Sequence, residues 1–341
     1  MIRAGRRACA AAALALLAGC AALTPPQTRA LQQSPPAALR QPVELRATPF
    51  FPQTEYECGP AALATALGAA GIAVRPEALT EQVYLPARRG SLQLEMLATA
   101  RRQGTLAVRL PPTLEAVLGE VSAGHPVVVL QNLALEIAPA WHYAVVIGHD
   151  LARGELLLRS GTTERQVLPI STFEHTWARG GHWAFVALPP GELPASATES
   201  ELAAAAVAFE RVATPAAARR VYDAALARWP DNLTLAIGAG NARHAAADLE
   251  GAARAFAAAA ERHDSAPAWI NLAEVRLAQG RRVEAEAAAR RALARAAIEP
   301  AWRDAAAATL QRVEAARRAA ERPRRAAPSR AAQPKDSQGA R

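Results

Sequence analysis

The chain has 341 residues, more than one compact core usually holds, so two domains with flanking segments are expected. Its formal net charge of +8 is concentrated at the ends, because three Arg precede residue 8 and residues 317–341 carry a net charge of +6. About −1 remains for residues 21–316, and such a nearly neutral body removes the main support for nucleic-acid binding.

Residues 1–19 have the composition of an export signal. Three Arg come first, and the apolar run Ala8–Leu17 that follows is too short to span a bilayer. The next residues, Leu17-Ala18-Gly19-Cys20, resemble the bacterial lipobox, which implies that Cys20 is lipidated and becomes the first residue of the mature protein. An ordinary cleaved signal followed by a chance Cys is the alternative.

The residues after the lipobox bear on location and tethering. Ala21 rather than Asp follows the Cys, which in lipoproteins of proteobacteria favours the outer membrane, so we expect a lipid anchor there with the protein facing the periplasm. Residues 20–46 are rich in Pro, Gln and Ala and show little periodicity. They predict a flexible tether that begins at the lipidated Cys20.

The next segment, residues 47–190, has helical patterns followed by strand patterns. This order predicts an α+β domain with an antiparallel sheet. The expected helices lie near residues 61–70, 76–84, 91–103 and 113–123, and the expected strands near residues 126–130, 141–148, 155–159, 164–169 and 182–188.

A Pro-rich stretch at residues 189–194 ends this domain, and we take residues 191–198 as a linker. Residues 199–321 are dominated by Ala, Arg, Glu and Leu and repeat with a period near 34 residues, the length of a tetratricopeptide unit. Aromatic, Gly and Pro positions such as Tyr222, Pro230 and Trp269 support this interpretation over generic helical hairpins. Residues 322–341 predict a basic, disordered tail, with contact to anionic lipid as an alternative.

Cys58 is the only Cys outside the leader and the lipobox, since the others are Cys9 and Cys20. An unpaired thiol in an oxidising compartment is usually buried or reactive. Cys58 directly precedes Gly59-Pro60 at the start of an apolar helical pattern, and a helix N-terminus favours a thiolate. The amide of Gln53 and the backbone N–H of Cys58 could together hold an oxyanion, and Gly59 could leave room for a substrate chain.

A base for this thiol must come from elsewhere in the chain, and His142 is the best candidate of seven His. It starts the apolar strand pattern of residues 141–148 that would cross the core beside the Cys helix. His149 lies an odd number of residues further on and would face away. We interpret the remaining five as structural or surface residues: His125, His175, His182, His244 and His263.

Together, Gln53, Cys58-Gly59-Pro60-Ala61 and His142-Tyr143-Ala144 resemble the double-glycine peptidase domain of bacteriocin exporters, which has a papain-like fold. The resemblance covers about residues 49–189 and implies that Cys58 is the nucleophile, His142 the general base and acid, and Gln53 the oxyanion donor. Lipobox, peptidase-like domain and tetratricopeptide repeats together also resemble a group of lipoproteins in proteobacteria.

Two positions depart from the exporter pattern. Ser160 occupies the place of the Asp that orients the imidazole, and a hydroxyl stabilises an imidazolium less than a carboxylate does. Asp150, Glu155 or Glu164 could supply the acid from a loop instead. Gln53 also precedes the Cys by five residues where the exporter domains commonly have six, which leaves its reach open.

The sequence therefore predicts a papain-like cysteine peptidase domain followed by an all-α tetratricopeptide domain. The expected function is that of a membrane-anchored thiol peptidase that cleaves a peptide or protein in the bacterial envelope, or a related amide-transfer enzyme. The alternative is a non-catalytic adaptor in which a degenerate peptidase domain binds peptides and the repeats recruit a partner. We expect no cofactor and no metal, because neither a ligand cluster nor a phosphate loop occurs in the sequence.

Overall fold

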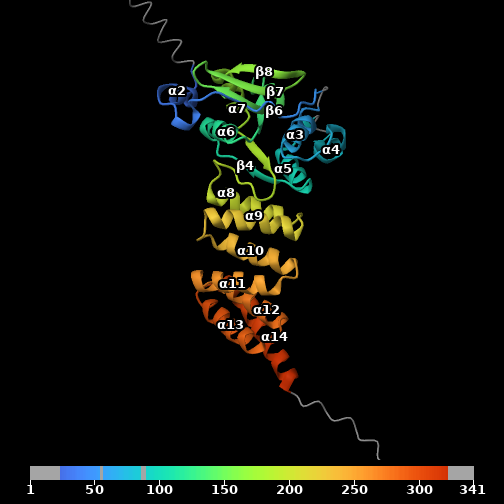
Figure 1. Cartoon of the computed structure of the whole chain (residues 1–341), viewed down its shortest axis with the longest axis vertical. Helices are drawn as coiled ribbons and strands as arrows, with labels where there is room; N and C mark the ends of the chain where they lie inside the picture. Colours follow the sequence, from blue (N-terminus) through green and yellow to red (C-terminus); the bar gives the residue numbers. More distant parts are fainter. Residues whose placement is uncertain (1–23, 54–56, 86–89, 322–341) are drawn as a thin grey trace, which may run out of the picture. The chain divides into compact units, whose positions relative to one another are not determined.

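The computed structural model describes residues 24–53, 57–85 and 90–321, so the expected leader, Cys20 and the tail at 322–341 lie outside the described residues. Two compact units are formed, residues 1–248 and 249–341, and each is described by itself. The first unit is built on an antiparallel sheet of seven strands (Figure 1). The described strands of this sheet are β1 (Val43–Glu44), β4 (Leu106–Arg109), β5 (Val127–Asn132), β6 (Trp141–Asp150), β7 (Glu155–Ser160), β8 (Thr163–Pro169) and β9 (Ala184–Leu188).

The strand order is β4-β9-β5-β6-β7-β8, with β1 paired to β6, and all of these pairs are antiparallel. β5 and β6 are long apolar runs because both faces of the sheet are covered. Gly148 in β6 allows β1 to approach, because a Cβ there would lie 2.5 Å from the carbonyl oxygen of Val43. β6 is thus the central element to which the segments on both sides connect.

Helices cover the two faces of the sheet and create two cores. On one face pack α3 (Cys58–Ala69), α4 (Pro76–Val83) and α5 (Gln93–Arg102), with the small hairpin β2 (Tyr84–Leu85) and β3 (Gly90–Ser91) beside them. On the other face pack α6 (Leu114–Ser122) and α7 (Ile170–Arg179). Alternate residues of β6 enter the two cores, Tyr143 and Val145 toward α3 and Ala144 and Val146 toward α6.

Residues 24–46 contain regular structure, which corrects the prediction of a flexible tether for this part of the chain. It forms α2 (Pro26–Gln33), the 3₁₀ turn η1 (Ala37–Leu39) and β1. α2 has no cap from its own N-cap side chain, and the buried carboxylate of Glu174 in α7 accepts from the backbone N–H groups of Gln27 and Thr28 at 2.9 and 2.6 Å. An anion at a helix N-terminus satisfies orphan donors, so this contact holds the segment on the domain.

The helices and strands expected between residues 47 and 190 are present, with shifts of a few residues at their ends. β4 and α7 were not predicted. β4 is four residues long and lies between two helices in the sequence, and α7 follows β8 without an intervening Gly. The short, unbroken patterns at these positions carry no clear start or stop signal.

The segment between the sheet and the repeats is fixed by a buried carboxylate. Glu120 of α6 accepts from the backbone N–H and the hydroxyl of Ser196 at 2.6 and 2.5 Å, and its second oxygen lies 2.7 Å from Nδ1 of His125. Burial opposes ionisation of Glu120, but the hydrogen bonds from His125 and Ser196 outweigh it and hold the pKa of Glu120 below its usual value. The expected linker at 191–198 is therefore pinned to the domain.

The repeat helices begin within the first unit. They are α8 (Glu199–Glu210), α9 (Pro215–Arg228) and α10 (Leu233–Ala245). α8 packs on β4, and side chains such as Leu202 and Phe209 belong to the same core as the strands above them. Between α9 and α10, a Cβ on Gly238 would lie 2.2 Å from the ring of Tyr222, so a small residue admits the aromatic ring at the helix crossing.

The second unit continues the all-α pattern. It contains α11 (Leu249–His263), α12 (Ala266–Ala278), α13 (Arg282–Arg295), the 3₁₀ turn η3 (Pro300–Trp302) and α14 (Arg303–Glu321), each helix packed on the next. Buried Ala residues line the crossings and Phe256 fills the space beside them. The domain limits predicted from the sequence, 47–190 and 199–321, remain predictions. In residues 24–53, 57–85 and 90–321, no helix combines the length and the apolar character needed to cross a membrane.

Glu120→Ala should lower the free energy of unfolding by about 1–3 kcal/mol at pH 7, because Ser196 and His125 would lose their buried partner. Since the pKa of Glu120 is depressed, its contribution is present above its ordinary pKa of about 4.3 and is lost as pH falls through the lower folded value. Urea unfolding at several pH values would measure this. The exposed Glu81→Ala is the control, and equal losses in both variants would contradict the assignment.

Candidate active site

Cys58 begins α3, and its half-buried sulfur lies against the start of β6. The backbone N–H groups of Tyr143, Gly59 and Cys58 lie near this sulfur and favour its thiolate form. Burial raises the pKa of the Cys58 thiol above its usual value, and these three donors offset only part of that effect. Burial thus opposes the lowering of the thiol pKa that is expected at a helix N-terminus.

His142 lies one residue before Tyr143 in β6, so the structure brings the predicted nucleophile and base to the same end of one strand. Nε2 of His142 lies 2.9 Å from Oγ of Ser160, at the end of β7. In the tautomer in which Nε2–H donates to this hydroxyl, Nδ1 is left as the basic nitrogen. Burial lowers the pKa of His142, so the imidazole is neutral at pH 7 and able to accept a proton.

Gln53 is anchored beside the same strand end despite its unusual spacing from Cys58. Its backbone N–H donates to the carbonyl of Gly161 at 3.0 Å, and the N–H of Gly161 donates back to Oε1 of Gln53 at 3.2 Å. The amide nitrogen Nε2 donates to the carbonyl of Tyr143 at a long 3.4 Å. The amide therefore lies next to the residue that contacts the sulfur, with a second N–H to offer.

In the structure, Ser160 is the hydrogen-bond partner of the His142 ring, and its role in orienting the ring stays a prediction. Of the proposed alternatives, Asp150 accepts from the backbone N–H of Arg153 at the far end of β6, and Glu164 lies 3.9 Å from Arg159. Glu155 is at the opposite end of β7 from Ser160. The partner of the imidazole in the resting site is thus a neutral hydroxyl.

Sequence reasoning missed Ser91. A Cβ on Gly59 would lie 2.1 Å from Oγ of Ser91, so the space left by this glycine is filled by the β2–β3 hairpin and not by a substrate chain. The backbone carbonyl of Ser91 also accepts from the hydroxyl of Tyr143 at 3.1 Å. Burial raises the pKa of Tyr143, which keeps this hydroxyl protonated as a donor. Gly59 and Tyr143 each follow a predicted site residue in the sequence, so they could be noticed there. Ser91 lies in no such motif and could not.

The other histidines with described contacts have structural surroundings. His149 is fully buried with Nε2 2.8 Å from Oγ of Ser122, His125 pairs with Glu120, and the ring of His182 packs edge-on against Trp177. None of these contacts involves Cys58 or Ser160. His142 remains the candidate base.

Part of this chain matches the model of one known protein family. Residues 45–184 match the model of the Peptidase_C39 like family. These residues form a C39-like peptidase domain. It is followed by an all-α region of helices α8 to α14. The fold class predicted from the sequence is thereby confirmed, while the catalytic roles of individual residues in the C39-like domain stay predictions.

Solved structures with similar folds fall into the same two groups. A putative C39-like peptidase from Bacillus anthracis is 20% identical, covering 43% of this chain and 98% of its own, with a TM-score of 0.36. A double-glycine protease from an AMS/PCAT transporter, solved with its leader peptide, is 20% identical over 41% of this chain and 91% of its own, with a TM-score of 0.32.

The tetratricopeptide domain of Sgt2 from Aspergillus fumigatus is 23% identical over 42% of this chain and 91% of its own, with a TM-score of 0.34. A search of curated proteins gives no match.

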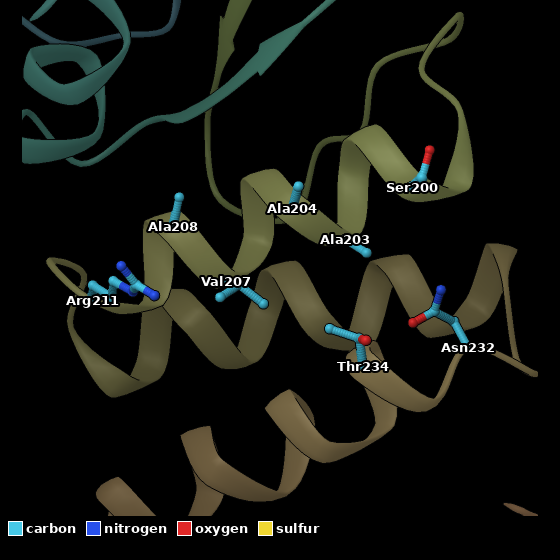
Figure 2. A pocket seen from close by; sticks show the side chains of 8 residues that line it. All are labelled: Ser200, Ala203, Ala204, Val207, Ala208, Arg211, Asn232 and Thr234. Carbon is cyan, nitrogen blue, oxygen red and sulfur yellow. The ribbon is translucent and has the colours of Figure 1, made fainter. Parts of the chain in front are cut away.

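A second candidate site lies on the first repeat helices, away from the catalytic residues in sequence. A pocket of about 570 Å³ opens along α8 and the start of α10. Figure 2 shows small side chains along α8, with Arg211 at one end, and beside them Thr234 of α10 and Asn232, which caps that helix. The lining residues are Ser200, Ala203, Ala204, Val207, Ala208, Arg211, Asn232 and Thr234. A floor of Ala and Val with polar ends could receive a peptide segment.

Ser160→Asp should increase the rate at which iodoacetamide alkylates Cys58 at pH 7 by about tenfold or more. A carboxylate beside Nε2 of His142 raises the imidazole pKa, and the resulting imidazolium lowers the thiol pKa by about one unit or more. Alkylation rates between acid and alkaline pH would measure both shifts. Ser160→Asn, which is similar in size and uncharged, is the control, and an equal increase in that variant would argue against the charge effect.

Proposed function

We propose that the protein is a cysteine peptidase that cleaves a peptide or protein through an acyl-enzyme. One observation carries the proposal: the sulfur of Cys58 lies near the backbone N–H of Tyr143, and the preceding residue His142 is hydrogen-bonded to Ser160. A structural Cys in a core has no need of a His in the residue next to its backbone neighbour Tyr143, nor of a hydroxyl that holds one nitrogen of that His.

The residues would act in two steps. Nδ1 of His142 takes the proton of Cys58 as the sulfur bonds to the substrate carbonyl carbon, and the same nitrogen then gives the proton to the amine when the C–N bond breaks. Water next attacks the thioester with His142 as base, the new C–O bond replaces the S–C bond, and the thiol is reformed. The amide of Gln53 and the N–H of Cys58 would donate to the oxyanion in both steps.

The resting pair is neutral, because burial raises the thiol pKa and lowers the imidazole pKa. The proton transfer must therefore be driven in the complex with substrate, and Ser160 helps less than a carboxylate would. We infer a slow enzyme with activity that increases above neutral pH, as more of the thiol ionises. An amine in place of water would give amide transfer from the same acyl-enzyme.

Cys58→Ala should abolish the appearance of new protein termini in the bacterial envelope. Terminal peptides from cells with the wild-type protein, Cys58→Ala and His142→Ala would be compared by mass spectrometry. The proposal requires the same set of termini to disappear in both variants. It fails if the termini of envelope proteins are identical in all three strains while the variants are folded and present in equal amounts.

The pocket on α8 and α10 supports a second candidate, a non-catalytic adaptor that recruits a protein partner through the repeats. Ser160 in the place of the acid points the same way, because a binding domain does not need to stabilise an imidazolium. The peptidase and the adaptor can be distinguished by comparing bound partners and cleavage products in the same variants. An adaptor retains its bound partners in Cys58→Ala cells and loses them when a large side chain fills the pocket, as in Ala204→Trp. A peptidase loses its products in Cys58→Ala cells.

We further propose that the protein is a lipoprotein, anchored through Cys20 and facing the periplasm from the outer membrane. The lipobox at 17–20 supports this. Thr24 is the first described residue, so about four peptide units, spanning at most roughly 14 Å, separate Cys20 from the segment held by Glu174. A lipid on Cys20 would thus hold the C39-like domain close to the membrane surface instead of on a long tether.

Cys20→Ser should move the protein from the membrane fraction to the soluble fraction of the envelope. Attachment of a lipid chain requires the thiol, and Ser cannot replace it. Detergent phase partitioning and metabolic labelling with a fatty-acid analogue would measure the change, with Cys58→Ser as the matched control. Labelling that persists in Cys20→Ser would rule out this anchor.

A further inference from the structure

A strip of large apolar side chains is exposed on the hairpin that joins β5 to β6. It consists of Leu133, Leu135 and Ile137, which are 52%, 68% and 91% exposed, and we call it the hairpin strip. Exposed apolar side chains that are clustered, unlike single ones, indicate an interaction surface. The strip ends a few residues before His142, so it borders the candidate active site.

The backbone under the strip is firmly held. The N–H of Leu133 donates to Ala140 at 2.9 Å, and the N–H of Ala138 donates to Leu135 at 3.1 Å. Oδ1 of Asn132 accepts from the N–H groups of Ala134 and Ala140 at 3.1 and 2.9 Å. At the base, the guanidinium of Arg179 donates to the carbonyl of Asn132 at 3.0 Å. The apolar side chains are thus displayed by an ordered hairpin with its polar groups paired.

The register of the hairpin places the strip in line with the base. Gln131 of β5 lies directly opposite His142 of β6, and opposed residues of an antiparallel pair point to the same face. Pairing continues past the end of β5, because the N–H of Leu133 donates to Ala140 and Leu135 forms a bridge with Ala138. Leu133 and Leu135 are two and four residues beyond Gln131, which is roughly 7 and 13 Å at the spacing of an extended strand.

We propose that the hairpin strip binds large apolar side chains of the substrate on the carboxyl side of the scissile bond. This inference rests on the proposed peptidase function. His142 gives its proton to the leaving amine, so the chain that follows the cleaved bond lies on the His142 side of Cys58. The hairpin extends further in that direction, away from the sulfur. An extended substrate segment would place alternate side chains on Leu133 and Leu135.

Charge favours a peptide over a membrane as the occupant. Within residues 131–141 the only ionisable side chain is that of Glu136, so the hairpin offers no cation to anionic lipid headgroups. A membrane-inserting loop of this kind would gain nothing from electrostatic attraction. An apolar peptide segment needs no such charge.

Peptide binding can be measured without catalysis in the full chain carrying Cys58→Ala. The probes are a fluorescent peptide with Leu at alternate positions and the same peptide with Ser at those positions. We expect the Leu peptide to bind about tenfold more tightly, and the preference to disappear when L133S and L135S are added. V283S with I298S, also exposed apolar positions, is the matched control and should keep the preference. Equal binding of both peptides, or an unchanged preference in the L133S/L135S protein, would overturn the proposal.

Cleavage of a mixture of cellular peptides by the wild-type protein shows on which side of the scissile bond the apolar residues bind. We expect Leu, Ile and Phe to be enriched in the first residues after the cut. Enrichment only before the cut would overturn the assignment to the leaving side. If the Leu peptide binds through the strip but no peptide is cleaved, the docking surface stands and the peptidase function fails.

Sedimentation with vesicles of phosphatidylethanolamine and phosphatidylglycerol tests the other occupant. The protein carrying Cys20→Ser should remain in solution whether or not L133S and L135S are present. Vesicle binding that is lost with these two substitutions would assign the strip to lipid and overturn the proposal.

Discussion

The contact between the first turn of α3 and the start of β6 is the constraint on which the candidate site depends. Gly59 permits it, because a side chain at that position would collide with Ser91. The hydroxyl of Tyr143 binds the same hairpin residue, and the backbone of Tyr143 reaches the sulfur. α3, the β2–β3 hairpin and β6 are far apart in the sequence, and these contacts hold them around one thiol. His142, the candidate base, is the residue before Tyr143.

Local sequence signals sufficed for the parts of this arrangement that depend on one element. Cys58-Gly59-Pro60 marks the helix start, and the strand that begins near His142 follows from its apolar run, so both residues could be named without the structure. The pairing of His142 with Ser160 could be predicted only from the family resemblance, because Ser160 has no sequence signal of its own. The raised thiol pKa could not be predicted, because burial depends on tertiary packing, which opposes the helix N-terminus.

The ordered N-terminal segment could not be predicted for a related reason. α2 is short and rich in Gln, and its helix N-terminus is satisfied by Glu174, almost 150 residues away in the sequence. A composition that favours a flexible chain is overridden by a single buried carboxylate that accepts from the first turn. The repeats, in contrast, depend on contacts between sequential helices, and a period near 34 residues with its aromatic, Gly and Pro positions predicted them.

The shared core of α8 and the sheet has a consequence for how the chain can be divided. Leu202, Ala206 and Phe209 of α8 are fully or almost fully buried in the cluster that includes β4 and β9. A cut in the Pro-rich segment at 189–194 would uncover apolar surface on both pieces, and each buried Leu or Phe side chain exposed in this way costs about 1.5–3 kcal/mol. The C39-like domain therefore owes part of its solubility to the first helices of the all-α region, and a shortened chain that preserves its fold would have to keep them.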